Sequence, residues 1–337
     1  MANLKDIAKA CGLSVATVSR VFNEPQKVSP KTRALVLETA EKLNFSLNQV
    51  ASALRSGKSK SIGVLLPFIN NHVFASAIKA MEEVFRAAAY SLIISQSHES
   101  LEKEEEALEN FRRLQLDGVL LSISKERERM GKWDTLKNFP APLLLFDRNI
   151  ANDEIPSVHI DNILAAYTAT MHLIEQGCTS LLHLGGNESL TIFQERLEGF
   201  EKAVQSEKNV KGSLIRDFDP RSEESNRVFR KLLGRNSGID AILAHGDIAA
   251  LHAIQLLQEL GKKIPEDVAV VGFGNSRFCS YISPGLSSVD QANEALGKLA
   301  AQKLLAQLEG RTERMDSHVL TAELVVRGSS LRESYRH

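Results

Sequence analysis

The sequence has few cysteines and no long apolar run, and both shortages exclude classes of protein. Three cysteines, Cys11, Cys178 and Cys279, occur among 337 residues, and none belongs to a CxxC motif. Isolated cysteines provide neither a disulfide framework nor a zinc site, so we expect small buried side chains. No run of about 18 apolar residues is present, which predicts that no helix spans a membrane. No basic segment followed by an apolar stretch comes after Met1, so we expect a cytoplasmic protein.

The signature motifs of common enzymes are also missing. Segment 56–59 (SGKS) has the lysine of a phosphate-binding loop but lacks the preceding glycine, and no predicted strand comes before it. Segment 272–275 (GFGN) lacks the third glycine of a dinucleotide-binding motif. No GxSxG or HExxH sequence occurs, and no histidine pair has the spacing of metal ligands. We therefore expect no enzymatic activity, no metal ion and no cofactor.

Charge is distributed unevenly along the chain. Residues 1–60 carry ten basic and four acidic side chains, a net charge of +6. The other residues carry 31 basic and 38 acidic side chains, a net charge of −7, so the total of −1 conceals two parts of opposite sign. A basic segment attached to an acidic body is typical of a polyanion-binding arm. The sequence therefore predicts that the N-terminal residues bind a nucleic acid.

The first 45 residues have the pattern of three short helices. Asn3 and Ser14 are N-cap residues for the first two helices, and Gly12 ends the first one. Ser29 followed by Pro30 is typical of the start of a third helix. A helix, a short turn that contains glycine and a second helix form the helix-turn-helix arrangement. We predict an all-α DNA-binding head over residues 1–45.

The second of these helices carries side chains suited to DNA. The N-terminal residues of such a helix meet base edges in the major groove, and here they are Val15, Ala16 and Arg20. Small apolar side chains contact the thymine methyl group, and arginine donates two hydrogen bonds to guanine. The alternative is an ordinary solvent-exposed helix face. Short polar side chains that suit phosphate oxygens lie on the same helix, namely Ser14, Thr17, Ser19 and Asn23.

Residues 46–60 differ from the segments on either side. Val50, Ala51 and Leu54 could form the apolar face of a helix of about seven residues, which is marginal in water by itself. Gly57 and the polar residues after it indicate a linker. We expect this segment to be frayed when the protein is alone.

From residue 61 onward, apolar runs alternate with amphipathic segments. This alternation predicts parallel sheets covered by helices on both faces. The number of predicted strands over roughly 270 residues is too large for one ordinary domain. We therefore predict an α/β body of two doubly wound lobes with a cleft at the strand carboxyl ends. We assign residues 61–156 and 291–318 to lobe 1, and residues 157–290 and 319–337 to lobe 2. The predicted strands are 62–67, 91–95, 118–123, 142–147, 157–160, 180–184, 214–218, 241–244, 268–273 and 319–326.

Three motifs follow one another in the N-terminal residues. They are LKDIAKACGLSVATVSRVFN at 4–23, VSPKTRALV at 28–36 and NQVASALRSGK at 48–58. In residue type and spacing they resemble the lactose-repressor (LacI/GalR) family of bacterial transcription regulators. The resemblance continues through FDR at 146–148 and RLEGF at 196–200. It implies a body like the type I periplasmic binding proteins, and a homodimer that binds palindromic operator DNA, without a membrane partner.

The resemblance also assigns roles to residues of the head and the hinge. Val15, Ala16 and Arg20 stand at positions where the family reads bases. Asn48–Leu54 matches the hinge helix, which in the family folds on operator DNA, with Asn48, Ala51 and Leu54 in the minor groove. Leu54 matches the leucine that wedges into a base step, the alternative being packing against the body. Gln49 replaces a common arginine, so one phosphate contact is expected to be missing. The implied DNA backbone contacts are Ser14, Thr17, Ser19, Asn23 and Lys27.

The family binds a small effector, such as a sugar, a sugar derivative or another metabolite, between the two lobes. Arg196 fits this role because its guanidinium can recognise hydroxyl or carboxylate groups, the alternative being a salt bridge between elements. The effector changes operator affinity, and repression is the usual outcome in the family. The resemblance places such a regulator in the bacterial cytoplasm, on the nucleoid when it is bound. Positions that match the family's pocket are Phe74, Asp147, Arg196, Phe218, His245, Gly274 and Gln291.

The expected pocket departs from the family pattern in three segments. His245-Gly246 replaces the usual Asn-Asp, and Gly274-Asn275 replaces the usual Asp-Asp. Segment 71–74 reads NHVF instead of Asn-Pro-Phe-Phe. Without these carboxylate acceptors for sugar hydroxyls, the pocket is predicted to bind an effector other than a simple neutral monosaccharide, for example an anion. The alternative is a pocket that has drifted from the family pattern.

Two half-sites in an operator require two heads, and a two-fold dimer matches a palindrome. The resemblance places the dimer contact chiefly on the first lobe, at residues 73–89, although an apolar face on that helix also suits packing within the lobe. The alternative function is that of a cytosolic small-molecule-binding protein with no regulatory DNA role. An enzyme on this fold would instead have to turn over a bound metabolite.

Overall fold

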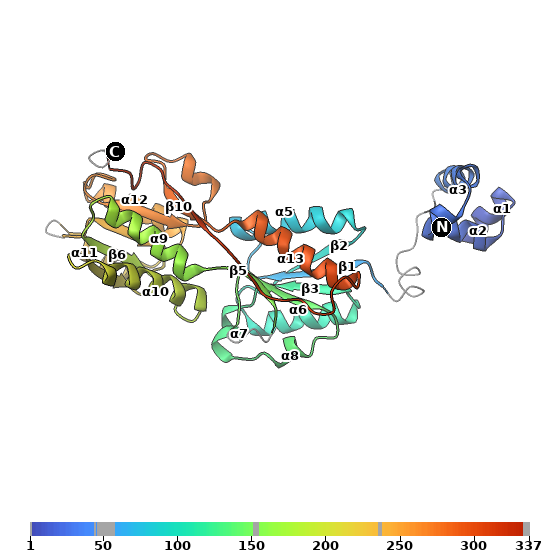
Figure 1. The fold of residues 1–337 in the computed structure, drawn as a ribbon, viewed down its shortest axis with the longest axis horizontal. Helices are drawn as coiled ribbons and strands as arrows, with labels where there is room; N and C mark the ends of the chain where they lie inside the picture. The colour runs from blue at the N-terminus through green and yellow to red at the C-terminus, as the bar shows by residue number, and fades with distance from the viewer. Residues whose placement is uncertain (1, 44, 46–57, 151–154, 235–237, 333–337) are drawn as a thin grey trace. The chain divides into compact units, whose positions relative to one another are not determined.

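The computed structural model describes residues 2–43, 45, 58–150, 155–234 and 238–332. The chain divides into two compact units, Met1–Ser59 and Lys60–His337 (Figure 1). We call the first unit the head and the second unit the body. The predicted hinge residues Asn48, Ala51 and Leu54 lie outside the described residues.

The described part of the head contains the three α-helices that its capping residues predict. They are α1 (Leu4–Cys11), α2 (Val15–Asn23) and α3 (Pro30–Lys42), with a short 3-10 helix η1 (Pro25–Lys27) after α2. Apolar side chains from all three α-helices meet in one small core and leave the other faces to solvent. The buried residues of this core are Ile7, Ala8, Val18, Val21, Val36 and Ala40.

Each head helix begins at a residue whose side chain caps it. Ser14 and Ser29 accept hydrogen bonds from the backbone N–H three residues later, at 3.1 and 3.2 Å. Asn3 forms a capping box at the start of α1. Gly12 ends α1 with φ at 65°, a conformation that glycine adopts without strain. The turn between α1 and α2 is therefore determined locally, by residues whose roles can be read from the sequence.

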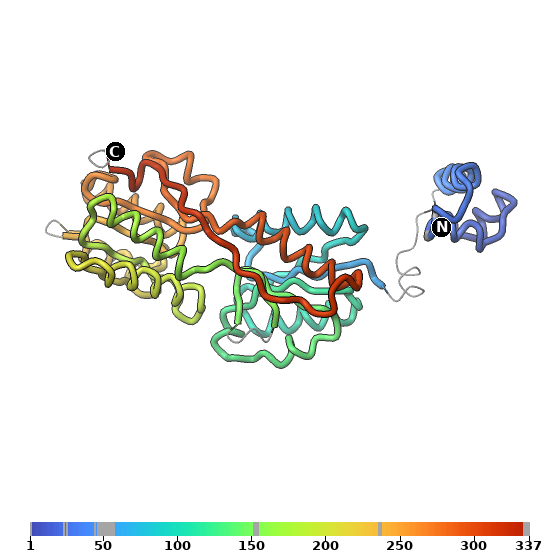
Figure 2. Tube along the Cα trace, viewed as in Figure 1, coloured from blue at the N-terminus to red at the C-terminus, as the bar shows by residue number. Residues whose placement is uncertain are grey.

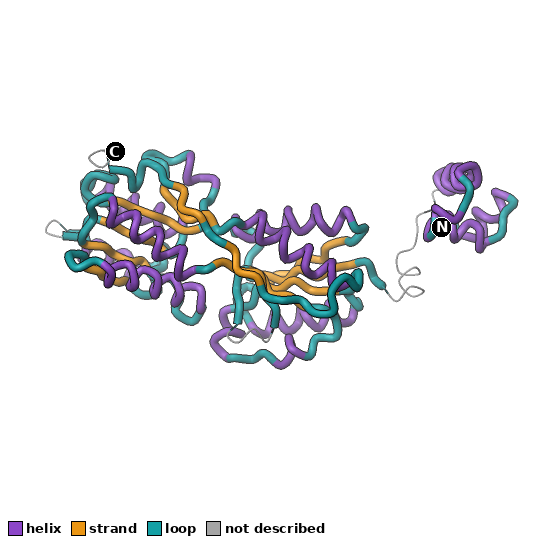
Figure 3. Tube along the Cα trace, viewed as in Figure 1, coloured by secondary structure: helices purple, strands orange, loops and turns teal. Residues whose placement is uncertain are grey.

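The first lobe of the body is built on a six-stranded parallel sheet with the order β11-β5-β4-β3-β1-β2. Helices cover both faces of the sheet, so each lobe has a layered arrangement (Figure 3). One core packs against α5 and α13, and the other packs against α6 and α8. The elements are β1 (Ser61–Leu66), α5 (His72–Ala87), β2 (Ser91–Gln96), α6 (Leu101–Arg113), β3 (Gly118–Leu121), α7 (Lys125–Met130), α8 (Asp134–Lys137), β4 (Leu143–Phe146), β5 (Ser157–Ile160), α13 (Asn293–Leu308) and β11 (His318–Leu320).

The second lobe repeats this plan with the strand order β12-β10-β9-β8-β6-β7. Strand β12 is antiparallel to β10, and the other pairs are parallel. Helices α9 and α10 pack against one face of the sheet, and α11 and α12 pack against the other. The elements are α9 (Asn162–Glu175), β6 (Ser180–Leu184), α10 (Thr191–Ser206), β7 (Lys211–Ile215), α11 (Glu223–Leu232), β8 (Ala241–Ala244), α12 (Asp247–Glu259), β9 (Ala269–Phe273), η3 (Arg277–Ser280), β10 (Ser287–Asp290) and β12 (Glu323–Val325).

The chain changes lobes at positions that differ from those predicted. Strand β5 pairs with β4 and therefore belongs to the first lobe, so the first crossing follows Ile160 and not residue 156. The predicted strand 319–326 is two strands, because β11 pairs with β5 and β12 pairs with β10. The last crossing therefore lies after Leu320 and not after residue 318. Figure 2 shows the chain passing between the lobes beside these strands.

Several elements of the body also differ from prediction. The strand predicted at 214–218 is β7 and ends at Ile215, since Phe218 turns into the core of the second lobe. Strand β10 was not among the predicted strands. Helices α7, α8 and α11 were missed too, and they are only six, four and ten residues long. Segments of four and six residues give little periodicity from which a helix can be predicted, whereas α11 is amphipathic and could have been predicted.

Two of the three cysteines have the buried side chains that the sequence predicts. Cys178 and Cys279 are buried and Cys11 is partly buried against the head core. Among the helices that the structure describes, none combines the length and apolar character needed to cross a membrane. No group of three or more potential metal ligands is found among the described residues.

Gly199 on α10 allows this helix to approach α9 closely, and an alanine there is expected to destabilise the body. A Cβ atom at this position would lie 2.2 Å from the Ile163 carbonyl oxygen, which is backbone and cannot turn away. Alanine gains about 1 kcal/mol of helix propensity, but overpacking of this kind costs about 1–3 kcal/mol, so we expect a net loss for Gly199→Ala. Urea unfolding measures it, with Gly238→Ala as control because nothing lies within 4 Å of that Cβ. Equal stability of both variants would contradict the close contact.

Candidate DNA-binding face and effector site

Helix α2 divides its side chains between the head core and solvent. Val18 and Val21 are buried, with exposed fractions of 0% and 3%. Val15, Ala16 and Arg20 are exposed on the remaining surface, and Val15 has an exposed fraction of 42%. The structure thus brings the three predicted base-reading residues together on one helix, none of them needed for the core. This arrangement suits insertion of α2 into a major groove.

The predicted backbone-contacting residues are spread from the N-cap of α2 to the short helix η1 after it. Ser14 Oγ and Thr17 Oγ1 are 2.9 Å apart, and both hydroxyls are also near the N-terminal N–H groups of the helix. Helix N-termini favour phosphate because their N–H groups and dipole attract negative charge. Ser19 is partly buried, and Lys27 is exposed. The side chain of Asn23 lies outside the described residues.

Lys27 is expected to bind phosphate without reading sequence. Its Nζ lies 2.9 Å from Glu24 Oε1, and both side chains are well exposed. Lys27→Ala should weaken binding to all DNA sequences alike, and should reduce the slope of log K against log salt by about 0.9. Fluorescence anisotropy at several salt concentrations measures both effects. The control is Lys42→Ala, which removes a similarly exposed lysine paired with Glu38, and a sequence-selective loss at Lys27 would refute the phosphate role.

Arg196 on α10 is a buried cation at the strand carboxyl ends of the second lobe. Its Nε donates to Asn162 Oδ1 at 3.0 Å, Nη1 donates to the His245 carbonyl oxygen at 2.7 Å, and Nη2 donates to Gln291 Oε1 at 3.3 Å. The guanidinium carbon lies 3.7 Å from the centre of the Phe273 ring. Asn162, His245 and Gln291 follow β5, β8 and β10, and Phe273 is the last residue of β9, so the strand ends orient the guanidinium.

The hydrogen-bond partners of Arg196 are neutral groups, which helps to distinguish ligand binding from a salt bridge between elements. Among the described residues it makes no ion pair with a carboxylate, so the predicted alternative of a salt bridge between elements finds no support there. Burial lowers the pKa of Arg196 to about 10, against the opposing charges of Asp147, Glu195 and Asp247. Its Nη1 and Nη2 atoms each have a second N–H beyond those in these bonds. The site can therefore donate hydrogen bonds to a ligand.

His245 and Gln291 complete this cluster, and Gly274 lies beside it. Burial, and then the charge of Arg196, lowers the pKa of His245 to about 4, so its ring is neutral at pH 7. Its Nδ1 lies 3.2 Å from the Leu184 carbonyl oxygen and can donate to it, which leaves Nε2 as an acceptor. Gly274 has φ at 127°, and a Cβ there would lie 3.7 Å from Gln291 Nε2. Four of the predicted pocket residues, Arg196 among them, are therefore brought together.

Asp247 and Asn162 are members of this region that are not among the predicted pocket residues, although the sequence already places Asp247 with His245 at a strand end where a site could be. Asp247 is buried, accepts a hydrogen bond from Ser288 Oγ at 2.5 Å, and would lie 3.2 Å from a Cβ at Gly274. Asn162 bridges Arg196 and Glu195 with its amide oxygen and nitrogen. Both are first residues of helices that follow strands, which is the signal that could have found them. Phe193, whose ring centre lies 5.4 Å from that of His245, was also missed.

Asp147 lies at the carboxyl end of a strand in the first lobe, as the residues around Arg196 do in the second lobe. It follows β4 with φ at 67°, and Ser122 Oγ donates to its Oδ2 at 3.4 Å. Burial raises the pKa of Asp147, although the charges of Arg148 and Arg196 oppose this effect. Arg196 and Asp147 are thus electrostatic neighbours although they belong to different lobes. The pairing agrees with a site between the lobes.

Phe74 and Phe218 are placed in the cores of the lobes, apart from the Arg196 cluster. Phe74 packs edge-on against Phe146, with ring centres 6.1 Å apart, and is 3% exposed. Phe218 lies 6.0 Å from the Phe229 ring centre and is also 3% exposed. Both positions match the family's pocket in sequence, but here burial of the aromatic rings determines where they lie.

Comparisons with known proteins agree with both parts of the fold. The model of the "Bacterial regulatory proteins, lacI family" matches residues 3–48, and that of the "Periplasmic binding protein-like domain" matches residues 170–330. The ribose operon repressor of Halalkalibacterium halodurans is 32% identical over 331 residues, which cover 97% of this chain and 96% of that protein. The repressor PurR of Proteus mirabilis is 31% identical over 332 residues, covering 98% and 97%.

Solved structures show the same likeness over the whole chain. The Lac repressor dimer bound to operator and the anti-inducer ONPF superposes with a TM-score of 0.84 at 25% identity, covering 98% of this chain and 99% of that one. The Lac repressor bound to ONPG in the repressed state gives a TM-score of 0.82 at 25% identity, covering 97% and 99%. The chain belongs to the lacI family of bacterial regulatory proteins, and it is a DNA-binding transcription repressor regulated by a small ligand, not an enzyme.

Proposed function

We propose that this repressor binds a palindromic operator as a homodimer and that an effector between the lobes sets its operator affinity. The exposed face of α2 supports the base contacts of Val15, Ala16 and Arg20. A two-fold dimer presents two such helices to two half-sites. The dimer contact is proposed on the first lobe, through α5 and the neighbouring edge strand β2, where Ile94 is 39% exposed.

The proposed division of the chain follows the observed strand pairing. Residues 1–45 form the head and residues 46–60 form the hinge, with Asn48, Ala51 and Leu54 in the minor groove. The first lobe comprises 61–160 and 291–320, and the second lobe comprises 161–290 and 321–337. A regulator of this kind acts in the bacterial cytoplasm and is associated with the nucleoid while it is bound to its operator.

The observation that best supports the proposed effector site is the buried guanidinium of Arg196. Its hydrogen-bond partners are neutral groups from several strand ends. A buried charge is costly unless hydrogen bonds compensate it, and a ligand that accepts the remaining N–H groups adds that compensation. The effector changes operator affinity only by as much as it prefers one body conformation over the other. Effector binding and operator binding are therefore thermodynamically linked.

The chemistry of the effector is proposed from the residues that surround Arg196. The relatives are named as a ribose operon repressor and as PurR, which supports a sugar, a sugar derivative or another metabolite. The neutral His245 ring and the absence of a side chain at Gly274 leave fewer carboxylate acceptors for sugar hydroxyls. These features favour an effector other than a simple neutral monosaccharide.

Selection of duplexes from a random library by the full-length protein tests the DNA-binding proposal. We expect enrichment of one palindromic sequence, and binding that weakens steeply with salt as phosphate contacts require. Recovery of no common sequence, or binding without salt dependence, would contradict the proposal and favour a small-molecule-binding protein with no DNA role.

A thermal-shift panel on the full chain tests the effector proposal. The panel contains ribose, glucose, ribose 5-phosphate, hypoxanthine and guanine, each at several concentrations. A ligand at about 100 times its Kd stabilises the folded state by about 2.7 kcal/mol, which raises the midpoint measurably. If a neutral hexose were the tightest binder of the panel, the proposal that the pocket prefers other ligands would be wrong.

A further inference from the structure

Helix α10, which carries Arg196, begins without a capping side chain of its own. Its N-cap residue is Leu190, whose aliphatic side chain makes no hydrogen bond to the first turn. The first N–H groups of a helix have no partner within the helix, and the helix dipole favours a negative charge at this end. The first turn of α10 is therefore open to a capping group from another segment of the chain.

The capping group comes from the first lobe. Glu128 Oε1, on α7, accepts a hydrogen bond from the backbone N–H of Thr191 at 2.6 Å. Thr191 is the first residue of α10 in the second lobe, and 63 positions separate it from Glu128. A carboxylate at a helix N-terminus is a favourable cap. The contact joins the two lobes at the helix that holds Arg196.

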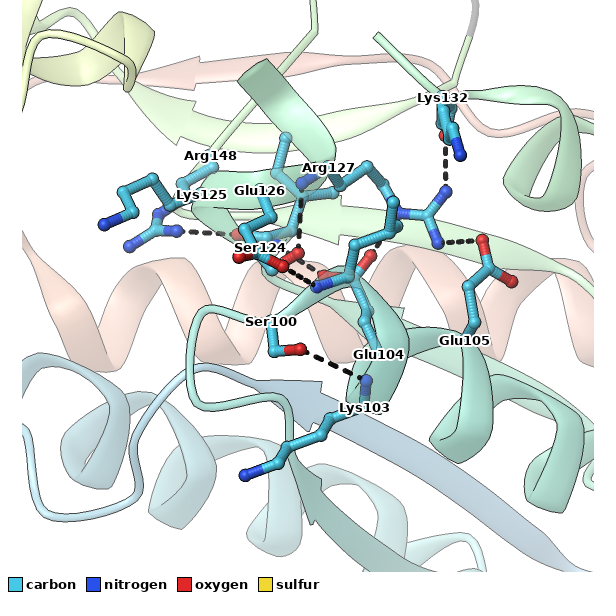
Figure 4. Close-up of polar contacts among 12 residues, drawn as sticks. Ser100, Lys103, Glu104, Glu105, Ser124, Lys125, Glu126, Arg127, Lys132 and Arg148 are labelled. Atoms are coloured by element: carbon cyan, nitrogen blue, oxygen red, sulfur yellow. Dashed lines mark hydrogen bonds and ion pairs between the residues drawn. The ribbon is translucent and has the colours of Figure 1, made fainter. Parts of the chain in front are cut away.

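Helix α7 is anchored within the first lobe by buried charges, several of which Figure 4 shows. The fully buried side chain of Arg127 forms an ion pair with Glu104. Arg148 Nη2 donates to Glu99 Oε1 at 2.7 Å, and Glu99 Oε2 accepts the first backbone N–H of α7 at 2.7 Å. Because these bonds fix α7 to its own lobe, Glu128 cannot follow α10 when the lobes rotate.

The contact between Glu128 and Thr191 depends on a single oxygen atom. Glu128 Oε2 has no hydrogen-bond partner among the described residues, so Oε1 alone makes the bond. Burial raises the pKa of Glu128, and this effect is opposed by hydrogen bonds from the side chain and the backbone N–H of Thr191 and by the charge of Arg148. Opening the contact therefore breaks the bonding of Glu128 to Thr191 and leaves the network around α7 intact.

We propose that Glu128 and the Thr191 N–H form a latch between the lobes, and that Glu128 is a positioning residue for the effector site. With the latch formed, α10 holds Arg196 within electrostatic reach of Asp147 in the first lobe. With the latch broken, the lobes are free to separate. This inference rests on the proposed function, because the latch biases the lobe equilibrium on which an effector acts.

Two substitutions remove the latch from opposite sides. Thr191→Pro removes the donor, and proline is favoured at the first position of a helix. The preceding residue, Leu190, already has the extended conformation that proline requires, with φ −106° and ψ 123°. Glu128→Ala removes the acceptor, whereas Glu128→Gln keeps one. The matched control is Glu223→Pro at the first position of α11, whose N-cap residue Ser222 is also extended.

Spin labels on the two lobes of the full-length, ligand-free protein report the lobe arrangement. Cysteines introduced at Glu106 and Gln258 place exposed labels on α6 and α12. Cys11 is replaced by serine, whereas Cys178 and Cys279 are 1% and 0% exposed and do not react. Double electron–electron resonance then gives the distribution of distances between the labels.

Labelled protein is mixed with an excess of unlabelled protein, so that a dimer carries labels on one protomer. We then expect one dominant distance in the parent and a larger population of a longer distance in both latch variants. Glu128→Ala and Thr191→Pro should each raise the ratio of the longer to the shorter population about tenfold, as expected for one hydrogen bond to a charged group. The double variant should show no further increase, because both changes remove the same bond. Glu128→Gln and Glu223→Pro should stay close to the parent.

Unchanged distances in both Glu128→Ala and Thr191→Pro would overturn the latch, and so would additive effects in the double variant. Thr191→Pro retains the α7 network and keeps the test valid if Glu128→Ala folds poorly. The distances are measured without DNA or ligand, so the prediction for the latch can fail while operator selection succeeds. Failure of the latch is thereby distinguished from failure of the proposed function.

Discussion

Replacement of Arg20 by alanine is expected to weaken operator binding by about 1–3 kcal/mol and to relax base preference at one position of each half-site. Arg20 is exposed on α2, whereas Val18 and Val21 fill the head core. The change should therefore remove the proposed bidentate contact to a base edge without altering the fold of the head. Anisotropy titrations against the selected operator and its single-base variants measure both the loss and the relaxed preference.

Arg20→Lys separates charge from base reading. Lysine keeps the positive charge and hence the attraction to phosphate, but it lacks the planar fork that donates two parallel hydrogen bonds. We expect this variant to bind non-specific DNA like the parent and to discriminate poorly at the same base pair as Arg20→Ala. A uniform loss across all sequences in Arg20→Ala would show that this residue contacts phosphate and does not read a base.

Replacement of Arg196 by methionine is expected to weaken effector binding strongly while operator binding persists. The ligand loses the N–H groups that Nη1 and Nη2 present, at about 1.5 kcal/mol for each hydrogen bond to a charged group. Effector affinity should fall roughly a hundredfold for two such bonds. Calorimetric titration with the ligand from the thermal-shift panel measures this loss.

The control for Arg196→Met is Arg221→Met in the same lobe. Arg221 is exposed and forms its ion pair with Asp219, so its removal should leave effector affinity unchanged. Thermal unfolding of both variants accompanies the titration, because Arg196→Met also leaves Asn162 Oδ1 and Gln291 Oε1 without their donor. Undiminished effector binding by a folded Arg196→Met protein would remove Arg196 from the site.

The head could be predicted from the sequence because local residues determine it. Asn3, Ser14 and Ser29 cap the helices that follow them, and Gly12 supplies the left-handed residue that ends α1. The alternation of strands and helices in the body could be predicted for the same reason. Each strand is a short apolar run, and each longer helix has a sufficient repeat of apolar residues.

The lobe boundaries and part of the effector site could not be predicted, because they depend on pairing between distant segments. Strand β5 resembles any buried strand in sequence, and only its pairing with β4 assigns it to the first lobe. Phe74 and Phe218 match pocket positions by alignment, yet their rings fill the cores. The contact of Glu128 with Thr191 joins segments 63 positions apart and leaves no local pattern.

In the proposed function, effector binding and operator binding are linked through the body. The most direct test of this linkage is a calorimetric cycle on the full-length protein, in which effector affinity is measured with and without saturating operator, and operator affinity with and without saturating effector. Linkage predicts that the two affinity ratios are equal and differ from one, typically by a factor of about 5–150. An effector that binds free and operator-bound protein with the same affinity would contradict the account.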